Sequence, residues 1–473
     1  MVTGAASSAT LLEDWCTELR KQSNSNRQDH PNYFASDPPS LITESLAHNF
    51  RVGVGDDVYS GILPAIETAE FEVILVTCFW ARSTSLARLS NTLRTLSSKS
   101  IARGGPKIRV RICFSSLSLF QKLCHTSSPA GYIYPPSTWV KKLGLPPPAD
   151  LTGLDLQIKS VFVRPFSVMH PKFIVVDRTR VWLPSCNVSW EAWFEGCIEL
   201  SGPILQQFVR FWKACWAGES ERVEGIGEAR LDMNQSAIQN RTGDTGTNQQ
   251  AAGFLPAIVH FDISEPTPAV FLPSPHHVNP RFRPFPWQSA PEPPPTPLNT
   301  FTLQLFGSAT SSIYIQTPNL TAPPVLTALL RALQRGVDVH VVTSERLMIL
   351  EQLGTAGTTT ARCVKKLVRR YKRLPRAASP ASDLESATPK VGRLHIEYYR
   401  SQNSNTPKEP TQSHLKLTIV DANWVILGSG NMDRASWYTS QELGVAFCSP
   451  EVAAAVQGVV RQGLEGRIKV VHS

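Results

Sequence analysis

The sequence predicts an α/β fold in which one structural unit is used twice. Residues 70–200 and 308–445 show the same order of patterns: an apolar strand, an amphipathic helix, a second strand, and a final pair of strands. The chain has 473 residues, which is long for one domain and sufficient for two. Strand–helix–strand units are typical of right-handed crossovers in a largely parallel sheet covered by helices.

The elements of the two units correspond in order. The first strands are predicted at 73–79 and 312–318, and the second strands within 104–116 and 335–345. Between them, apolar residues recur at helical spacing. These are Leu86, Leu89 and Leu93 in the first unit and Val325, Leu329, Leu330 and Leu333 in the second.

Changes of composition set the predicted domain boundaries. Residues 1–40 are expected to form a partly disordered N-terminal arm, 41–217 the first half and 299–473 the second half. Between the halves, residues 218–298 are polar and then Pro-rich, which indicates a linker or surface insertion with polyproline character. A basic insertion at 361–376 has its apolar residues on one helical face.

Composition is that of a globular protein with a basic surface. Hydrophobic residues make up 42% and charged residues 18% of the chain, and the net charge of +9 favours acidic partners without choosing among them. Nine cysteines without a CxxC pair predict buried thiols in a reducing compartment rather than a zinc site. Without a signal peptide or a transmembrane run, we expect an intracellular monomer, cytoplasmic or peripheral to a membrane.

Each unit ends in the same five-residue pattern. The first copy contains His170, Lys172, Asp177, Ser185 and Asn187, and the second contains, at identical spacing, His414, Lys416, Asp421, Ser429 and Asn431. Strand alternation places His and Lys on one face. A two-residue turn pairing Asp177 with Arg180 would bring Ser185 opposite Lys172 and Asn187 opposite His170, with the same register in the second copy.

Such a patch suits a phosphate diester. Lysine binds a nonbridging oxygen, Ser and Asn add hydrogen bonds to the phosphate, and histidine attacks phosphorus or transfers a proton. A two-step displacement needs both a nucleophile and an acid for the leaving oxygen. One copy has a single histidine, so the duplication predicts one active site that His170 and His414 share.

The carboxylates of the pattern have a different expected role. Asp177 and Asp421 belong to the candidate catalytic motif, but each follows its histidine by seven residues, about 23 Å along a strand. They are therefore expected to fix the turn. Glu199 and Glu442, in apolar segments after the motifs, are the predicted orienting partners of the histidines. The alternative places them in water on an edge strand.

The doubled HxKxxxxD motif followed by SxN resembles the phospholipase D superfamily. The second copy, GSGNMDRASWYTSQE, is similar to cardiolipin synthase-like phosphatidyltransferases, with Asp433, Ser436 and Glu442 in place and Arg434 one position early. The resemblance covers most of residues 45–450. It implies two α/β/α sandwich halves related by a pseudo-twofold axis, a phosphohistidine intermediate, no metal and no cofactor, with His170 as nucleophile and His414 as general acid. The first copy departs from the pattern at Pro184, where the second has Gly428.

Three functions are compatible with these features. The first is a phospholipase D or phosphatidyltransferase acting on phospholipids, with aromatic residues Trp190, Trp193 and Phe194 either near a membrane interface or in the core. The second is a nuclease, whose basic stretch from Arg362 to Arg376 would follow a nucleic-acid backbone. The third is a non-catalytic phosphate-binding scaffold whose Pro-rich linker engages a polyproline-binding partner. The intact His and Lys pairs favour an enzyme.

Overall fold

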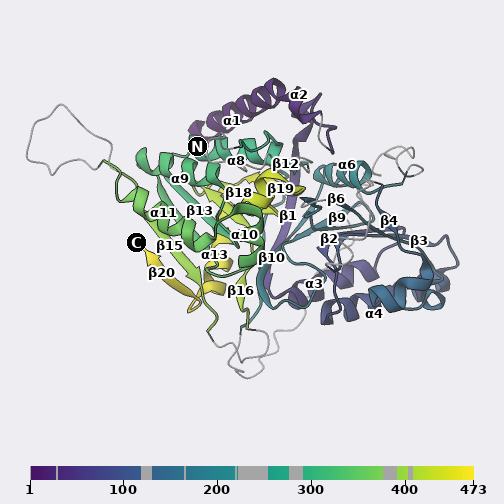
Figure 1. The fold of residues 1–473 in the computed structure, drawn as a ribbon. Helices are drawn as coiled ribbons and strands as arrows, with labels where there is room; N and C mark the ends of the chain where they lie inside the picture. The colour runs from purple at the N-terminus through teal and green to yellow at the C-terminus, as the bar shows by residue number, and fades with distance from the viewer. Residues whose placement is uncertain are drawn as a thin grey trace, which may run out of the picture.

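The computed structural model describes residues 2–27, 30–118, 130–163, 167–218, 221, 254–275, 291–375, 391–402 and 409–473. Residues 222–253 and 276–290 of the predicted linker lie outside these ranges. Figure 1 shows two α/β halves side by side, with the N-terminal helix above the second.

The first half is built on a mixed sheet in the order β5-β3-β2-β8-β9-β10-β1. The parallel strands are β2 (Glu72–Phe79), β3 (Ile108–Ser116) and β5 (Leu154–Ser160); the antiparallel ones are β8 (Phe173–Val176), β9 (Arg180–Pro184), β10 (Trp193–Ser201) and β1 (Ile42–Gly53). Helices α3 (Gly55–Glu67) and α4 (Thr84–Arg103) pack on one face, and α6 (Ile204–Cys215) on the other. The predicted strand–helix–strand order is confirmed here.

The second half repeats this plan in the order β20-β15-β14-β13-β17-β18-β19-β12. Its strands are β13 (Ser312–Thr317), β14 (Asp338–Thr343), β15 (Leu394–Tyr399), β17 (Leu417–Val420), β18 (Trp424–Gly428), β19 (Glu442–Cys448), β20 (Ile468–His472) and β12 (Thr267–Ser274). Its helices include α8 (Pro297–Ser308), α9 (Pro323–Gln334), α10 (Ile349–Ala356), α11 (Thr360–Tyr371), α12 (Arg434–Tyr438) and α13 (Pro450–Leu464). In α11, the predicted amphipathic basic helix is confirmed.

Strand β1 belongs to both sheets. Its first residues, Ile42–Ser45, pair with β12 of the second half, and its later residues pair with β10 and with β11 (Ala257–His260). The apolar core is also continuous, because the ring centroid of Phe208 on α6 lies 5.1 Å from that of Phe271 on β12. The predicted two-half α/β fold is therefore confirmed, with the halves joined through one extended sheet.

Two segments outside the predicted halves carry regular structure. The N-terminal arm contains α1 (Val2–Lys21), which packs on α8 (Figure 1). There the indole Nε1 of the fully buried Trp15 donates to Pro297 O and to Thr300 Oγ1, both at 3.2 Å. The predicted linker contains β11 and β12. Two prolines in β12 concealed it in the sequence, since proline is usually excluded from strands.

Among the helices of the described residues, none combines the length and the apolar character needed to cross a bilayer.

Candidate active site

The hairpin of each motif has a three-residue connection, not the two-residue turn that we predicted. Val176 pairs with Arg180, and Val420 pairs with Trp424, so the predicted register was wrong by one residue. The physical reason is a pair of left-handed residues at the start of each connection, with φ of 49° at Asp177 and 53° at Asp421 followed by a second positive φ. Both copies use the same loop.

The motif aspartates fasten this loop to the start of the neighbouring strand. Asp177 accepts backbone N–H bonds of 2.7–2.9 Å from residues 70–72. Asp421 accepts the equivalent bonds of 2.8–2.9 Å from residues 310–312, and two hydroxyl bonds as well. Burial alone would raise the pKa of Asp421, but these backbone donors outweigh it and lower the pKa. Neither aspartate bonds to a motif histidine, so their place among the candidate catalytic residues is corrected to the structural role.

Each histidine is bonded to a glutamate of the other half. His170 Nδ1 lies 2.8 Å from Glu442 Oε2, and His414 Nδ1 lies 2.8 Å from Glu195 Oε1. Backbone hydrogen bonds also connect each motif to the opposite half: His170 N donates to Gln441 O and His414 N donates to Phe194 O, both at 2.9 Å. Both glutamates are fully buried between the halves. The repeat thus brings both motifs into one symmetric constellation.

Glu199, predicted to orient a histidine, does not do so. Its carboxylate contacts the side chains of Asn49 (2.5 Å) and Arg180 instead. The residue that sequence reasoning missed is Glu195, four positions earlier on the same strand. The prediction assumed that the orienting glutamate follows the motif asparagine at nearly the same distance in both halves. The distances differ, because α12 lengthens the connection in the second half only.

A local signal could have identified Glu195. In both halves the glutamate directly precedes a short apolar run that contains a glycine, as EGCI at 195–198 and ELGV at 442–445. It also directly precedes the residue whose carbonyl accepts the motif serine N–H: Gly196 for Ser185 and Leu443 for Ser429.

The motif serines hold the glutamates rather than a substrate phosphate. Ser185 Oγ donates to Glu195 and accepts from Gly196 N at 2.9 Å. Ser429 Oγ donates to Glu442 Oε2 at 2.5 Å and accepts from Leu443 N at 3.0 Å. Each hydroxyl has a single proton, which the carboxylate already takes, so none remains for a phosphate oxygen. The phosphate-binding prediction for both serines is therefore corrected.

The two asparagines differ in their contacts. Asn187 Oδ1 accepts from Phe79 N at 3.1 Å, and its amide nitrogen bonds to no other described residue, which leaves two N–H donors. Asn431 Nδ2 donates to Asp433 Oδ2 at 3.2 Å, and its Oδ1 is buried without a partner among the described residues. Asn187 keeps both donors that its predicted phosphate-binding role requires, and Asn431 keeps one.

The lysines are buried beside their histidines. Lys172 Nζ donates to His170 O at 2.8 Å and Lys416 Nζ donates to His414 O at 2.6 Å, so each ammonium has two further protons to donate. Burial, together with the positive charge of Lys172, lowers the pKa of Lys416 to about 7 against the opposing effect of Glu195. The nearby carboxylates therefore do not fully compensate the positive charge of Lys416.

The histidines favour their neutral form in this environment. Burial lowers the pKa of His414 to about 4 despite Glu195, and it lowers the pKa of His170 despite Glu442. For Glu195 and Glu442, burial would raise the pKa, but the histidine and its hydrogen bond outweigh it and lower the pKa. With Nδ1–H donated to a carboxylate, the lone pair of each imidazole lies on Nε2. An anionic phosphate would supply the missing negative charge.

Further residues of the second motif complete one side of the site. Ser436 Oγ donates to Glu442 Oε1 at 2.6 Å, and Asp433 caps α12 by accepting from Ser436 N at 2.8 Å. Arg434 lies over the ring of Tyr438, 4.2 Å from its centroid. At Pro184 the first copy loses a backbone donor, yet the next N–H, that of Ser185, still donates to Gly196 O at 2.8 Å.

The aromatic cluster after the first motif has three different environments. The Trp193 ring centroid lies 4.7 Å from that of His414, so this indole forms one wall of the site. Phe194 is buried in the core, and Trp190 is 70% exposed.

Comparisons with known proteins found one matching family and several similar solved structures. A family described as "Cardiolipin synthase, PLD-like domain" matches residues 302–462. The structure of phosphatidylserine synthase from Haemophilus influenzae Rd KW20 is similar with a TM-score of 0.55 and 13% identity, over 91% of this chain and 90% of that one. Nuc, a phospholipase D family member from Salmonella typhimurium, matches with a TM-score of 0.26 and 22% identity, over 37% of this chain and 91% of that one. No curated protein sequence matches significantly.

The family match therefore identifies residues 302–462 as similar to a cardiolipin synthase-type, PLD-like domain, and the similarity to the solved synthase shows that the two-half fold is shared. The matched residues lie in the second half, which contains the second copy of the motif.

Proposed function

We propose that this protein is a phosphodiesterase that acts on phospholipids, as a phospholipase D or phosphatidyltransferase, through a phosphohistidine intermediate and without a metal. The observation that carries the proposal is the pair of His–Glu hydrogen bonds, each 2.8 Å long, in which each histidine is bonded to a glutamate of the other half. This arrangement supplies two oriented imidazoles and two buried ammonium groups, which is what a two-step displacement at phosphorus requires.

In the first step, His170 Nε2 attacks phosphorus and forms an N–P bond while the bond from phosphorus to the leaving oxygen breaks. His414 gives its Nε2 proton to that oxygen. In the second step, His414 takes a proton from water or an alcohol, which attacks phosphorus and releases His170. The negative charge of the substrate phosphate stabilises the proton on His414, which burial disfavours. Lys172, Lys416 and the Asn187 amide hold the nonbridging oxygens.

A surface next to the site supports a lipid substrate. Met348 and the α10 residues Ile349, Leu350 and Leu353 are exposed, with Leu350 86% exposed. The neighbouring α11 turns Cys363, Val364, Leu367 and Tyr371 inward and carries five basic residues between Arg362 and Arg370. Exposed apolar side chains beside a basic helix suit peripheral contact with an anionic membrane.

A cavity connects this surface with the active-site loop. Its volume is about 660 Å³, and Leu326, Leu330, Leu353 and Leu367 line it together with Arg362, Lys366, Arg370 and Arg434. Arg434 N donates to Thr321 Oγ1 at 3.1 Å, which places the cavity beside the segment that carries Asn431. Mixed apolar and cationic walls suit an amphiphilic anion, which favours a phospholipid over a nucleic acid. The names of the matching family and of the similar synthase agree with this choice.

The test is turnover by the purified protein in EDTA. Vesicles of phosphatidylcholine and phosphatidylglycerol with a primary alcohol are compared with single-stranded and duplex DNA. We expect phosphatidic acid or a phosphatidyl-alcohol, and a loss of at least about 10³-fold in His170→Ala and in His414→Ala. Lys172→Ala and Lys416→Ala should each lose about 10²-fold. Cleavage of DNA while the lipid stays intact would contradict the proposal and favour a nuclease. Binding of phosphodiesters without turnover would favour a non-catalytic phosphate-binding scaffold.

The assigned nucleophile has its own test. Acid hydrolyses the N–P bond of phosphohistidine, so the reaction is quenched in alkali and the modified residue is located by mass spectrometry. The phosphoryl group is expected on His170, and its appearance on His414 would reverse the two roles.

The proposed membrane-contact surface, formed by the exposed apolar residues of α10 beside the basic helix α11, is tested with a matched pair of exposed leucines. Leu350→Glu should weaken binding to anionic vesicles and slow turnover on them, while turnover of a short-chain monomeric phospholipid stays unchanged. Leu255→Glu alters a leucine that is 79% exposed elsewhere and should change neither. Equal effects of the two substitutions would contradict the membrane-contact surface.

A further inference from the structure

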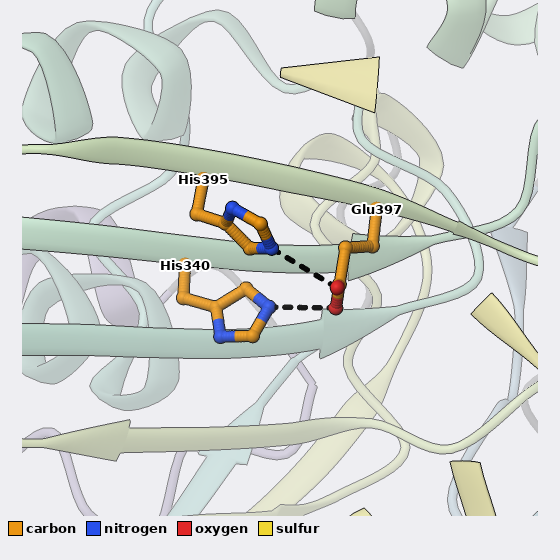
Figure 2. A group of neighbouring side chains, drawn as sticks. All are labelled: His340, His395 and Glu397. Atoms are coloured by element: carbon orange, nitrogen blue, oxygen red, sulfur yellow. Dashed lines mark hydrogen bonds and ion pairs between the residues drawn. The ribbon is translucent and has the colours of Figure 1, made fainter. Parts of the chain in front are cut away.

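Two histidines and a glutamate converge on the sheet of the second half, outside the active site. His340 Nε2 lies 2.8 Å from Glu397 Oε2, and His395 Nε2 lies 3.0 Å from Glu397 Oε1 (Figure 2). The carboxylate is thus bonded to both rings, and Figure 2 shows the second nitrogen of each ring turned away from it. None of these residues takes part in the proposed phosphodiester chemistry.

The strand register builds this cluster. His340 on β14 is the direct parallel partner of His395 on β15, and Glu397 follows His395 by two residues, so all three side chains lie on one face of the sheet. The ring of Tyr314, the direct partner of His340 on β13, packs edge-on against that histidine with 5.1 Å between centroids. The ligand atoms are therefore held on rigid, hydrogen-bonded strands and not on loops.

We propose that His340, His395 and Glu397 form a binding site for a divalent transition metal ion of the zinc class. Two imidazoles and one carboxylate are a donor set that Zn²⁺ uses when a fourth position is left open for water or a solute. The three ligand atoms lie within 4.8 Å of one another. The set contains no cysteine, so it disfavours metals that need thiolate ligands. Two of its three donors are imidazole nitrogens, so it also disfavours Mg²⁺ and Ca²⁺, which prefer oxygen ligands.

The geometry requires only a small rearrangement. Ligand bonds of about 2.0–2.1 Å at tetrahedral angles place neighbouring ligand atoms about 3.3 Å apart. The two N···O distances of 2.8 and 3.0 Å must therefore open slightly, and the two Nε2 atoms must come within that spacing. Rotation of the rings suffices, because the side chains of His340 and His395 are 39% and 33% exposed and have room to move. That exposure also gives a metal ion access from solvent.

The charges around the site set a limit on its affinity. Glu397 supplies one negative charge, and the guanidinium of Arg461 on α13 acts on His340 and opposes a cation. We therefore expect a dissociation constant for Zn²⁺ in the micromolar range, about 8 kcal/mol of binding free energy, and not the much tighter binding of closed structural sites.

The site is separate from the catalytic histidines. Ser344, whose hydroxyl donates to Ser413 O next to His414, lies four residues beyond His340, about 13 Å along the strand. A metal held by His340 therefore does not contact the phosphodiester. The expected consequence is local stabilisation of β14 and β15, because a ligand that binds only the folded state raises its stability.

Titration of the full-length, EDTA-stripped and desalted protein with Zn²⁺, followed by calorimetry, tests the proposal. One equivalent should bind, and His340→Gln or His395→Gln should weaken binding at least about 100-fold. His260→Gln, at an exposed histidine elsewhere, is the matched control and should bind as the unaltered protein does. Binding that survives both His340→Gln and His395→Gln, or no binding at 100-fold excess over about 1 μM protein, would overturn the site.

A second readout separates this site from the chain's cysteines. Co²⁺ bound by two imidazoles and a carboxylate shows visible ligand-field bands without the near-ultraviolet band of a cobalt–thiolate bond. A thiolate band would assign the metal to cysteines and reject the proposal. Phosphodiester turnover in EDTA should be the same in His340→Gln as in the unaltered protein, so failure of the metal site and failure of the proposed enzyme are distinguishable.

Discussion

At the residue scale, the central feature is that each imidazole is oriented by a carboxylate of the opposite half. Each glutamate is bonded to Nδ1, so in the reaction that we propose it stabilises the imidazolium while it forms and leaves Nε2 free to react. Glu442 accepts two serine hydroxyls in addition to His170, whereas Glu195 accepts one in addition to His414. The two histidines are therefore not electrostatically equivalent, although the motifs are identical.

Replacing either glutamate by glutamine is expected to reduce turnover by about 10²-fold or more. The amide keeps the size of the side chain but loses the charge that stabilises the imidazolium. The measurement is kcat with the proposed lipid substrate for Glu195→Gln and Glu442→Gln, after circular dichroism has shown that both fold.

Glu199→Gln is the matched control on the same strand. It removes an ion pair with Arg180, whose side chain is 32% exposed, and should cost at most about 1 kcal/mol of stability with kcat unchanged. A loss of turnover equal to that of Glu195→Gln would contradict the assignment of Glu195 as the orienting residue.

The buried histidines also predict how stability depends on pH. The pKa of His414 is about 4 in the folded protein and 6.5 as its ordinary value. Between these values the unfolded chain binds more protons, so the free energy of unfolding falls as pH decreases from 6.5 toward 4. His170, whose pKa is also lowered, acts in the same direction. Each group contributes a slope of up to about 1.4 kcal/mol per pH unit.

Urea unfolding at pH 7.5 and pH 5 measures this dependence. His414→Gln should lose less stability between the two values than the unaltered protein, whereas His260→Gln, at an exposed position, should leave the difference as it was. An unchanged difference in His414→Gln would show that this imidazole does not resist protonation in the fold.

At the element scale, the hairpin loop explains why the motif contains an aspartate far from the chemistry. Asp421 satisfies the first three backbone N–H groups of 310–312 and so fixes where β13 starts relative to β17. Asp421→Ala leaves these donors without that acceptor and should destabilise the protein by about 2–3 kcal/mol.

Turnover of the folded fraction should fall much less in Asp421→Ala than in His414→Ala, because the carboxylate does not reach the site. Chemical unfolding combined with kcat at low temperature tests both statements. A complete loss of turnover in a well-folded variant would return Asp421 to the catalytic residues.

Periodicity was sufficient for the elements that are local in sequence. The strands around 73–79 and 312–318 and the leucine-patterned helices follow from alternation and 3.6-residue spacing, and the doubled motif located both histidines and both lysines. The partner of each histidine could not be found this way, because Glu195 reaches His414 across 219 residues. Strand β12 was missed for a local reason, the prolines at 268 and 273, which its pairing with β1 and β19 tolerates.

At the scale of the whole molecule, the two halves are bound too closely to act as separate domains. They share β1, a continuous apolar core, and two buried His–Glu bonds. Ordinary domains within one chain meet through smaller and more polar interfaces. The proposed active site depends on this union, since neither half holds both a motif imidazole and the carboxylate bonded to it.

The halves should therefore unfold in one transition. Leu93 is buried in the part of the first-half core that α3 and α4 cover, and Leu93→Ala should cost about 2–5 kcal/mol. If unfolding is cooperative, the slowest-exchanging amides of β14 in the second half lose as much protection as those of β3 in the first. Hydrogen exchange with mass spectrometry measures both strands in one experiment. Normal protection of β14 beside a weakened β3 would mean that the halves unfold independently, and that the shared site is assembled by docking of two stable domains.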